Sequence, residues 1–228
     1  LAHPKTHIVN NNIMAISKKI EYPAIIKPCI GSGSRGIKLV NNSEELEQKY
    51  PEVHKNFGKS IIQEFIPHGG AFGVEMLYDS HGLVSKFVHK RIREYPESGG
   101  PSTSRISTNS KFMEFVAHKL VSSVRWTGPV MVEFRIDSRD KIPKIMEVNG
   151  RYWGSLRCSI AAGVDFPKRH YQSALSLSKE PDNYELNICS RWEVGEIMWL
   201  FFSRGNFFDK LKILSKNWFR DNYDFLTR

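Results

Sequence analysis

The sequence lacks the cysteine pairs that stabilise small secreted domains. Its 228 residues include 3 cysteines, an odd number, and none lies in a C-x-x-C pair that could bind zinc or exchange electrons. Long hydrophobic runs are also missing, because the longest, residues 197–202, is far shorter than the roughly 20 residues that a membrane-spanning helix needs. We therefore expect no signal peptide, no transmembrane segment and a reducing, cytoplasmic environment.

Motifs of several enzyme classes are absent as well. No G-x-S-x-G segment is present to hold a serine nucleophile, and none of the 8 histidines lies in an H-E-x-x-H segment. The segment Gly58-Lys59-Ser60 lacks the earlier glycine of a Walker loop. These absences argue against serine hydrolases, zinc proteases and P-loop nucleotidases.

The composition is that of a globular protein, with 40% hydrophobic and 25% charged residues. The net charge of +9 suggests an anionic partner. Nucleic acid, a phosphate-rich cofactor and an acidic membrane surface all satisfy that charge, so charge alone does not select one of them.

Short strands and helices alternate along the first part of the chain and predict an α+β protein. Turn residues and apolar runs predict strands over 24–28, 37–40, 60–66, 72–78, 83–91, 130–136 and 142–149. A helix is expected over 44–49, and another after Ser110, with Phe112, Val116, Leu120 and Val124 as its apolar face. The polar, serine-rich segment 93–110 is predicted to be a mobile loop, and the tail after Asp165 to be helical, aromatic and basic.

A glycine-rich loop, Gly31-Ser32-Gly33-Ser34-Arg35-Gly36, follows the first buried strand. It matches G-x-G-x-x-G, but the next residues read as a strand, so no helix N-terminus is available to a phosphate. Its uncrowded backbone N–H groups can instead form an anion-binding hairpin beside Lys27, Arg35 and Lys38. A flexible, solvated turn is the alternative.

Acidic and amide side chains alternate with apolar ones in the last predicted hairpin. Val130, Val132 and Phe134 share one face of a strand, and Glu133 lies on the other. If the apolar faces of the two strands coincide, Glu133 converges with Glu147 and Asn149, which are two residues apart. Two carboxylates and an amide oxygen suit magnesium, and Arg151 can bind phosphoryl or carboxylate oxygens. A solvated polar face of the hairpin is the alternative.

In this order and spacing, the Ile-Ile-Lys27-Pro strand, the glycine loop, Gln63-Glu64-Phe65-Ile66, Glu133 and Glu147-Val-Asn149-Gly-Arg151 resemble the ATP-grasp superfamily. The likeness is to carboxylate–amine ligases, related to the ATP-grasp domains of carbamoyl phosphate synthase and biotin carboxylase, and runs from about Lys5 to Ala174. It implies an α+β fold of two lobes that grip a nucleotide. We expect a small lobe over 1–67, a large lobe over 68–180 and a helical C-terminal extension over 181–228, with the usual preceding N-terminal domain absent from this chain.

The resemblance also implies roles for individual residues. Glu133, Glu147 and Asn149 would hold Mg²⁺, and Arg151 would face the transferred phosphoryl group. Independently of the resemblance, we expect the loop 93–110 to close as a lid over bound nucleotide and carboxylate, with Arg105 at their anionic oxygens. The nucleotide ATP would contact a larger set, namely Lys5, Lys27, Gly31, Ser32, Gly33, Ser34, Gly36 and the strand edge of Gln63, Glu64, Phe65 and Ile66. No acid occupies residues 68–72, where many relatives bind the ribose, and Glu75 is the remaining candidate.

The implied activity is ATP-dependent phosphorylation of a small-molecule carboxylate and capture of the acyl phosphate by an amine or similar nucleophile. A non-catalytic ATP-sensing module is the alternative. Nucleic-acid binding through Lys86, Lys90, Arg91, Arg93 and Arg105 is disfavoured, because nearby aromatic residues are too sparse for a stacking platform. The aromatic tail favours a helical subdomain or a homodimer contact over a membrane-surface helix.

Overall fold

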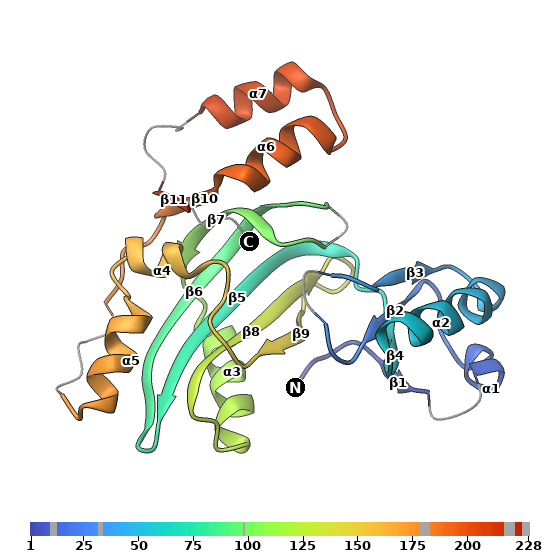
Figure 1. Ribbon diagram of the computed structural model, residues 1–228, viewed down its shortest axis with the longest axis horizontal. Helices are drawn as coiled ribbons and strands as arrows, with labels where there is room; N and C mark the ends of the chain where they lie inside the picture. The colour runs from blue at the N-terminus through green and yellow to red at the C-terminus, as the bar shows by residue number, and fades with distance from the viewer. Residues whose placement is uncertain (10–12, 32–33, 98, 178–182, 217–221, 225–228) are drawn as a thin grey trace. The chain divides into compact units, whose positions relative to one another are not determined.

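The computed structural model describes residues 1–9, 13–31, 34–97, 99–177, 183–216 and 222–224 (Figure 1). The chain forms two compact units. The N-terminal unit comprises Ala2–Gly69 and Ile136–Lys144, and the C-terminal unit comprises Leu1, Gly70–Arg135 and Ile145–Arg228. The segment Ile136–Lys144 contains the turn between two strands, so the N-terminal unit recruits a piece of chain from outside residues 1–67.

The N-terminal unit is built on a four-stranded sheet in the order β1-β4-β2-β3. Residues of this sheet and of its helices form one hydrophobic core, in which Ala24, Ile26, Val40, Leu46 and Ile62 are buried. Helix α2 begins after Asn42, whose side chain accepts a hydrogen bond from the Glu45 backbone N–H. The elements are β1 (Thr6–Ile8), α1 (Ile13–Ser17), β2 (Ala24–Pro28), β3 (Lys38–Val40), α2 (Ser43–Phe57) and β4 (Ser60–Glu64).

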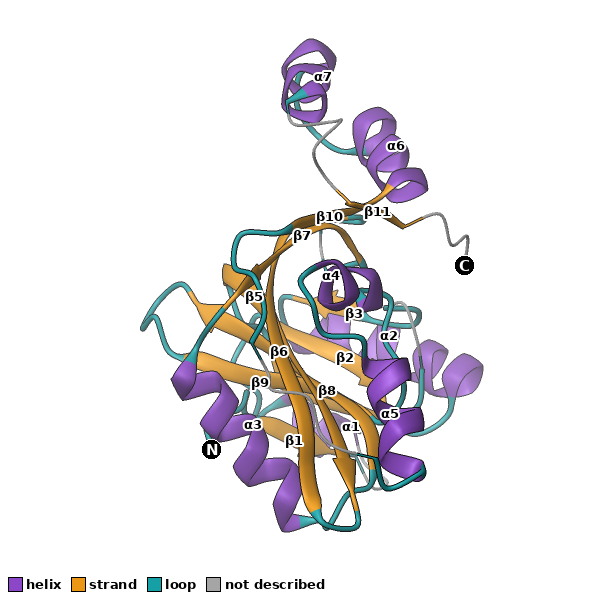
Figure 2. Cartoon of the chain, turned by 90° about the vertical axis from the view of Figure 1, so that its left-hand side faces the viewer, coloured by secondary structure: helices purple, strands orange, loops and turns teal. Residues whose placement is uncertain are grey.

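The C-terminal unit is built on a seven-stranded sheet in the order β11-β10-β7-β6-β5-β8-β9. Helix α3 lies on one face of the sheet and helices α4 and α5 lie on the other (Figure 2). The elements are β5 (His68–Asp79), β6 (Gly82–Glu94), β7 (Ser102–Thr108), α3 (Lys111–Ser123), β8 (Gly128–Asp137), β9 (Pro143–Asn149), α4 (Leu156–Ala161), α5 (Phe166–Ala174), β10 (Cys189–Trp192), α6 (Glu193–Phe202), α7 (Phe207–Ser215) and β11 (Asn222–Asp224).

Alternation along β5 determines what each face of this sheet contacts. The Tyr78 hydroxyl lies 2.7 Å from Nδ1 of His118 on α3. Leu77, on the opposite face, joins a core cluster with Phe87, Met131 and Cys158 of α4. The same alternation places Glu133 of β8 on the α4 side with Met131, and Val132 on the other side. The face assignment predicted for 130–136 is therefore confirmed.

Three sequence predictions are corrected by the fold. Half of segment 93–110 is not a mobile loop, because it forms the end of β6 and the whole of β7, which pairs with β6 and β10; residue 98 of this segment lies outside the described residues. The tail is not wholly helical, since β10 extends the large sheet. Helix α3 buries Met113, Val116, Ala117 and Val121, whereas Phe112 and Val124 are 57% and 67% exposed.

Among the described residues, no helix combines the length and apolar character that crossing a bilayer requires.

Candidate functional site

Strands β8 and β9 of the C-terminal unit bring three of the predicted site residues into one hydrogen-bonded chain. Asn149 at the end of β9 donates from Nδ2 to Glu133 Oε1 of β8 at 3.3 Å. Arg151 Nη2 then donates to the Asn149 side-chain oxygen, also at 3.3 Å. Glu133 and Asn149, 16 positions apart in the sequence, thus meet because β8 and β9 are neighbouring strands. The contact of Glu133 with Asn149 agrees with the convergence predicted for these two residues.

Glu147 lies two residues before Asn149 and is exposed. Because side chains alternate along a strand, Glu147 and Asn149 belong to the same face of β9. Glu133, Glu147 and Asn149 offer two carboxylates and an amide oxygen, which are hard donors of the kind that Mg²⁺ prefers. In the described part of the chain, no group of three or more His, Cys, Asp or Glu side chains is arranged to hold a metal. The donor set fits Mg²⁺ with oxygens of the nucleotide phosphates and water completing the coordination.

The turn after β9 requires glycine at position 150. A Cβ atom added to Gly150 would lie 2.5 Å from the ring of Trp126, closer than side chains approach one another. The ring therefore packs directly against the backbone between Asn149 and Arg151. This contact fixes the main chain from which both functional side chains project.

A cation that the sequence did not assign to the site lies beside Glu133. The Arg91 guanidinium on β6 contacts the Glu133 carboxylate at 2.5 Å and the Glu94 carboxylate at 3.2 Å. Burial alone would lower the pKa of Arg91, but the charges of Glu133 and Glu94 outweigh it and raise the pKa. Arg91 is thus a permanent cation held against the predicted metal ligand.

Arg105 does not occupy a lid, and the prediction that placed it there is wrong. It lies on β7 directly opposite Arg91 in the strand register and is 1% exposed. Its guanidinium donates to the Ser102 carbonyl and to the Ser190 hydroxyl, and burial lowers its pKa. The structure gives Arg105 the role of a buried cation that joins β7 to β10.

Glu75, the candidate for the ribose hydroxyls, is fully buried in β5. Its Oε1 accepts a hydrogen bond from Ser155 Oγ at 2.7 Å and lies 2.9 Å from Nδ1 of His89. These contacts connect β5 to β6 and to the start of α4. Glu75 therefore has a structural role.

In the N-terminal unit, Lys27 and Gln63 share the sheet face opposite the helices. Ala24 and Ile26 of β2 point into the core, so Ile25 and Lys27 lie on the other face, and Gln63 of β4 pairs with Ile25. Gln63 donates from Nε2 to Thr6 Oγ1 at 3.0 Å, while its buried Oε1 has no hydrogen-bond partner among the described residues. This face combines apolar surface with a cation and an amide, as a nucleotide site requires.

The glycine loop joins two antiparallel strands, as predicted, because β2 pairs with β3. Gly36 has a φ of 78°, and a Cβ atom there would lie 2.8 Å from both Phe57 and Pro28. Ser34 also has a positive φ, 60°, and accepts a hydrogen bond from the Ile37 backbone N–H. Gly31 is exposed, whereas Ser32 and Gly33 lie outside the described residues. The described part of the loop is a tight turn with left-handed backbone at Ser34 and Gly36, and its contact with phosphate stays a prediction.

The strand-edge description of Gln63 to Ile66 is wrong in one respect. Strand β4 is interior to its sheet, with β1 on one side and β2 on the other. The backbone N–H of Glu64 donates to the Lys5 carbonyl and that of Phe65 donates to the Pro23 carbonyl. Contact between this segment and adenine stays a prediction that must use groups other than these two.

An ion cluster anchors the recruited segment Ile136–Lys144 to the N-terminal unit. Asp137 is fully buried and accepts hydrogen bonds from Arg139 and from Lys144 Nζ, the latter at 2.7 Å. Arg139 also bonds the Glu64 carboxylate. Hydrogen bonds, chiefly from Arg139, hold the pKa of Asp137 far below its usual range.

Lys5, which is predicted to contact the nucleotide, forms an ion pair with Glu21 at 2.6 Å, and both side chains are exposed.

The basic cluster proposed for nucleic acid is largely neutralised by carboxylates. Lys86 pairs with Glu114, Arg93 pairs with Glu196, and Arg91 pairs with Glu133. These three cations are therefore held in ion pairs within the C-terminal unit.

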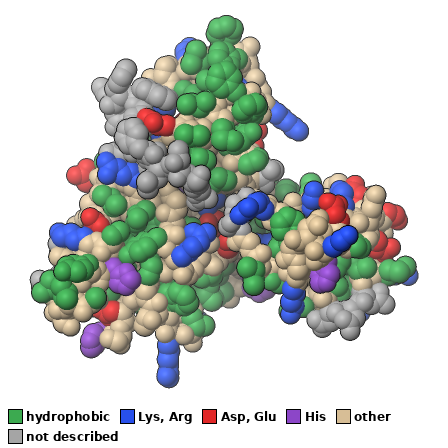
Figure 3. Space-filling view, viewed as in Figure 1, with side chains coloured by type: hydrophobic (Ala, Val, Ile, Leu, Met, Phe, Trp, Pro, Cys, Tyr) green, Lys and Arg blue, Asp and Glu red, His purple; other side chains and the backbone are tan. Residues whose placement is uncertain are grey.

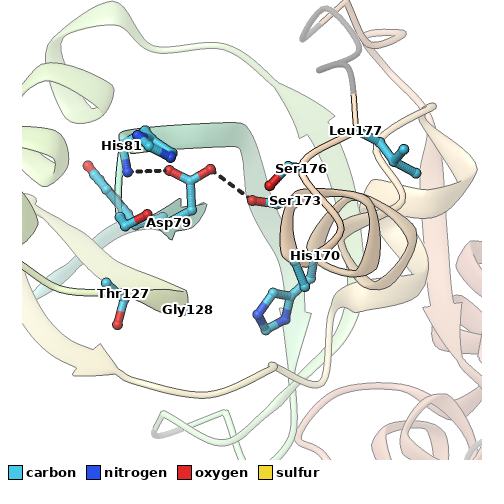
Figure 4. Close-up of a pocket in the computed structure, with 11 residues that line it drawn as sticks. Asp79, His81, Thr127, Gly128, His170, Ser173, Ser176 and Leu177 are labelled. Carbon is cyan, nitrogen blue, oxygen red and sulfur yellow. Dashed lines mark hydrogen bonds between the residues drawn. The ribbon is translucent and has the colours of Figure 1, made fainter.

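A cavity of about 720 Å³ lies at the hairpin end of β5 and β6 in the C-terminal unit (Figure 4). At its wall, Asp79 accepts hydrogen bonds from the His81 backbone N–H and from Ser173 Oγ. None of the predicted site residues lines this cavity.

Comparison with known proteins decides among the remaining interpretations. The model of the ATP-grasp domain family matches residues 3–155. The chain belongs to the ATP-grasp family. Biotin carboxylase 1 of Bacillus subtilis is 26% identical over 189 residues, which cover 75% of this chain and 42% of the relative.

Solved structures agree with this fold. N5-carboxyaminoimidazole synthetase from Staphylococcus aureus, complexed with ADP, aligns with a TM-score of 0.67 at 18% identity over 82% of this chain and 51% of that one. The biotin carboxylase domain of Hydrogenobacter thermophilus 2-oxoglutarate carboxylase, in complex with MgADP, ADP and bicarbonate, aligns with a TM-score of 0.62 at 19% identity over 82% and 46%. The chain spans about half of these relatives or less.

Proposed function

We propose that this protein is an ATP-dependent ligase that activates a carboxylate as an acyl phosphate. An oxygen of the substrate carboxylate attacks the γ-phosphorus of ATP, the bond to the bridging oxygen breaks, and ADP leaves. The nitrogen of an amine, or a similar nucleophile, then attacks the acyl carbon and expels inorganic phosphate, while the nucleophile loses a proton to solvent.

The hydrogen-bonded chain Glu133–Asn149–Arg151 is the observation that carries this proposal. Glu133, Glu147 and Asn149 would hold Mg²⁺, which supplies charge neutralisation for the phosphates. Arg151 would bind the transferred phosphoryl group, and its fixed, forked charge suits anionic oxygens. Lys27 and the glycine turn would bind the phosphates from the N-terminal unit. Phosphoryl transfer depends chiefly on such positioning and charge, so a covalent nucleophile on the protein is not needed.

Bicarbonate is a reasonable first carboxylate to test, because a solved relative contains it together with MgADP. The nucleophile, the oligomeric state and the contribution of a preceding N-terminal domain belong to the whole protein and are part of this proposal.

Release of inorganic phosphate from MgATP tests the proposal. We expect release to be stimulated by one member of a panel of bicarbonate, amino acids and other carboxylates, and to fall by at least about 100-fold in Arg151→Gln, since removal of one transition-state contact costs that order of magnitude. Lys141→Gln, at an exposed turn cation, is the matched control.

A non-catalytic ATP sensor is the second candidate, favoured by the structural role of Glu75, which leaves the ribose without its expected acid. It predicts binding of MgATP with no phosphate release above background for any carboxylate. Stimulated release excludes the sensor, whereas tight MgATP binding without release contradicts the ligase.

A further inference from the structure

The hairpin of α6 and α7 exposes a concentration of large apolar side chains. Four phenylalanines flank its Ser203–Asn206 loop, two on each side, and Phe202 and Phe208 are 72% and 76% exposed. Hydrophobic side chains gather over this part of the molecule in the space-filling view (Figure 3). The other large apolar residues exposed along the two helices are Val194, Ile197, Leu211 and Ile213.

The hairpin is anchored firmly on its other side, so these side chains do not belong to a loose end. Trp199, Leu200 and Leu214 form its small core. Arg93 of β6 pairs with the fully buried carboxylate of Glu196, and Arg191 of β10 donates to the carbonyls of Leu214 and Lys216 at the end of α7. Helix α6 is therefore apolar on two faces, of which the described residues cover only one.

The charges beside the exposed phenylalanines identify what fits the uncovered face. Arg204 in the loop, with Lys212 and Lys216, is exposed, and Asp209 is the exposed acid of the same stretch. Three cations against one anion complement a negatively charged surface, and the whole chain is basic at +9. In a symmetric contact with a second copy, the same patch would meet itself and bring like charges together. Charge complementarity thus favours an anionic partner with an apolar interior over the homodimer contact that the sequence alone favoured.

We propose that the α6–α7 hairpin docks this protein on an anionic membrane surface. Phe201, Phe202 and Phe208 enter the boundary between headgroups and acyl chains, while Arg204 and Lys212 bind lipid phosphates. Bulky apolar residues on one side with Lys and Arg beside them are the composition of helices that lie in this interface. The proposal does not depend on the ligase activity, since the hairpin shares no residue with the Glu133–Asn149–Arg151 site.

Cosedimentation of the full chain with lipid vesicles tests the proposal. We expect the wild type to bind vesicles of phosphatidylglycerol and phosphatidylcholine in equal parts and to bind pure phosphatidylcholine far more weakly. The double variant Phe202→Ser/Phe208→Ser should lose roughly tenfold or more of the partitioning, because each buried phenyl ring contributes more than a factor of ten at full insertion. Arg204→Gln/Lys212→Gln should weaken binding to the anionic vesicles alone.

Phe115→Ser is the matched control, because Phe115 is 62% exposed on α3 of the same unit. It should bind vesicles like the wild type, and circular dichroism should show that all variants keep the fold. Failure of the wild type to bind anionic vesicles overturns the proposal, as does undiminished binding by the double phenylalanine variant. A wild-type dimer that dissociates into monomers in that variant without lipid also overturns it, since the face would then be a homodimer interface.

Discussion

Arg91 and Glu133 form an ion pair in which the two charged groups lie 2.5 Å apart, with both side chains largely buried. The pair places a permanent cation on the carboxylate that the family resemblance assigns to Mg²⁺. Without metal, Arg91 compensates the charge of Glu133, which would otherwise be costly in this environment. Removal of the Arg91 charge should therefore change both the stability of the protein and its response to Mg²⁺.

Arg91→Gln should lower the free energy of unfolding by about 3 kcal/mol, because Glu133 and Glu94 lose their shared buried partner. Mg²⁺ should raise the unfolding temperature of this variant more than that of the wild type, since the metal replaces the missing charge on Glu133. Thermal unfolding with and without Mg²⁺ measures both effects. A variant as stable as the wild type would show that the ion pair contributes nothing to the fold.

Glu147→Gln should weaken the binding of ATP at saturating Mg²⁺ by roughly tenfold or more, because one hard ligand is lost and phosphate repulsion is less relieved. Calorimetric titration gives the two affinities directly. Glu97→Gln, at an exposed glutamate of the same unit, is the control and should bind like the wild type. Equal affinity of Glu147→Gln and the wild type would remove Glu147 from the metal site.

Lys27→Met should weaken the binding of ATP more than the binding of adenosine. The reason is that Lys27 is assigned to the phosphates, whereas the Gln63 to Ile66 segment is assigned to the base. Losing a charge-assisted contact to phosphate costs about 1.5–3 kcal/mol, or roughly 10-fold to 150-fold in affinity. Lys55→Met, at an exposed lysine of α2, is the control. Equal loss of both ligands would mean that Lys27 supports the fold instead.

Asp137→Asn should destabilise the protein by about 1–3 kcal/mol at pH 7, because Arg139 and Lys144 lose their charged acceptor. The pKa of Asp137 is lowered in the folded state, so its contribution is complete above the unfolded value near 4 and declines as the pH falls below it. Denaturant titrations at pH 7 and about pH 3 should therefore show a smaller difference between variant and wild type at the lower pH. A difference that is constant with pH would contradict the assigned charge state.

The sequence predicted the strands that carry the site because their alternation and turns are local signals. The partners of Arg91 were not predicted from the sequence, because the contact between Arg91 and Glu133 depends on the order in the sheet of strands that are far apart in the chain. The apolar face of α3 was misassigned because Phe112 and Val124 follow the same spacing as the buried residues Met113 and Val121, and tertiary contacts decide between the two stripes. Strand β7 was missed because five of its seven residues are serine or threonine, so it lacks the apolar alternation that predicts a strand, and its pairing with β6 and β10 involves residues far away in the sequence.

Transfer of oxygen-18 tests the central claim most directly. The carboxylate that stimulates phosphate release, labelled in its carboxyl oxygens, is turned over with unlabelled MgATP in unlabelled water, and the released phosphate is analysed by mass spectrometry. Formation of an acyl phosphate predicts one oxygen-18 atom in each phosphate released with product, because the attacking carboxylate oxygen leaves with phosphorus. Phosphate without the label, under conditions of full turnover, would contradict carboxylate activation by this protein.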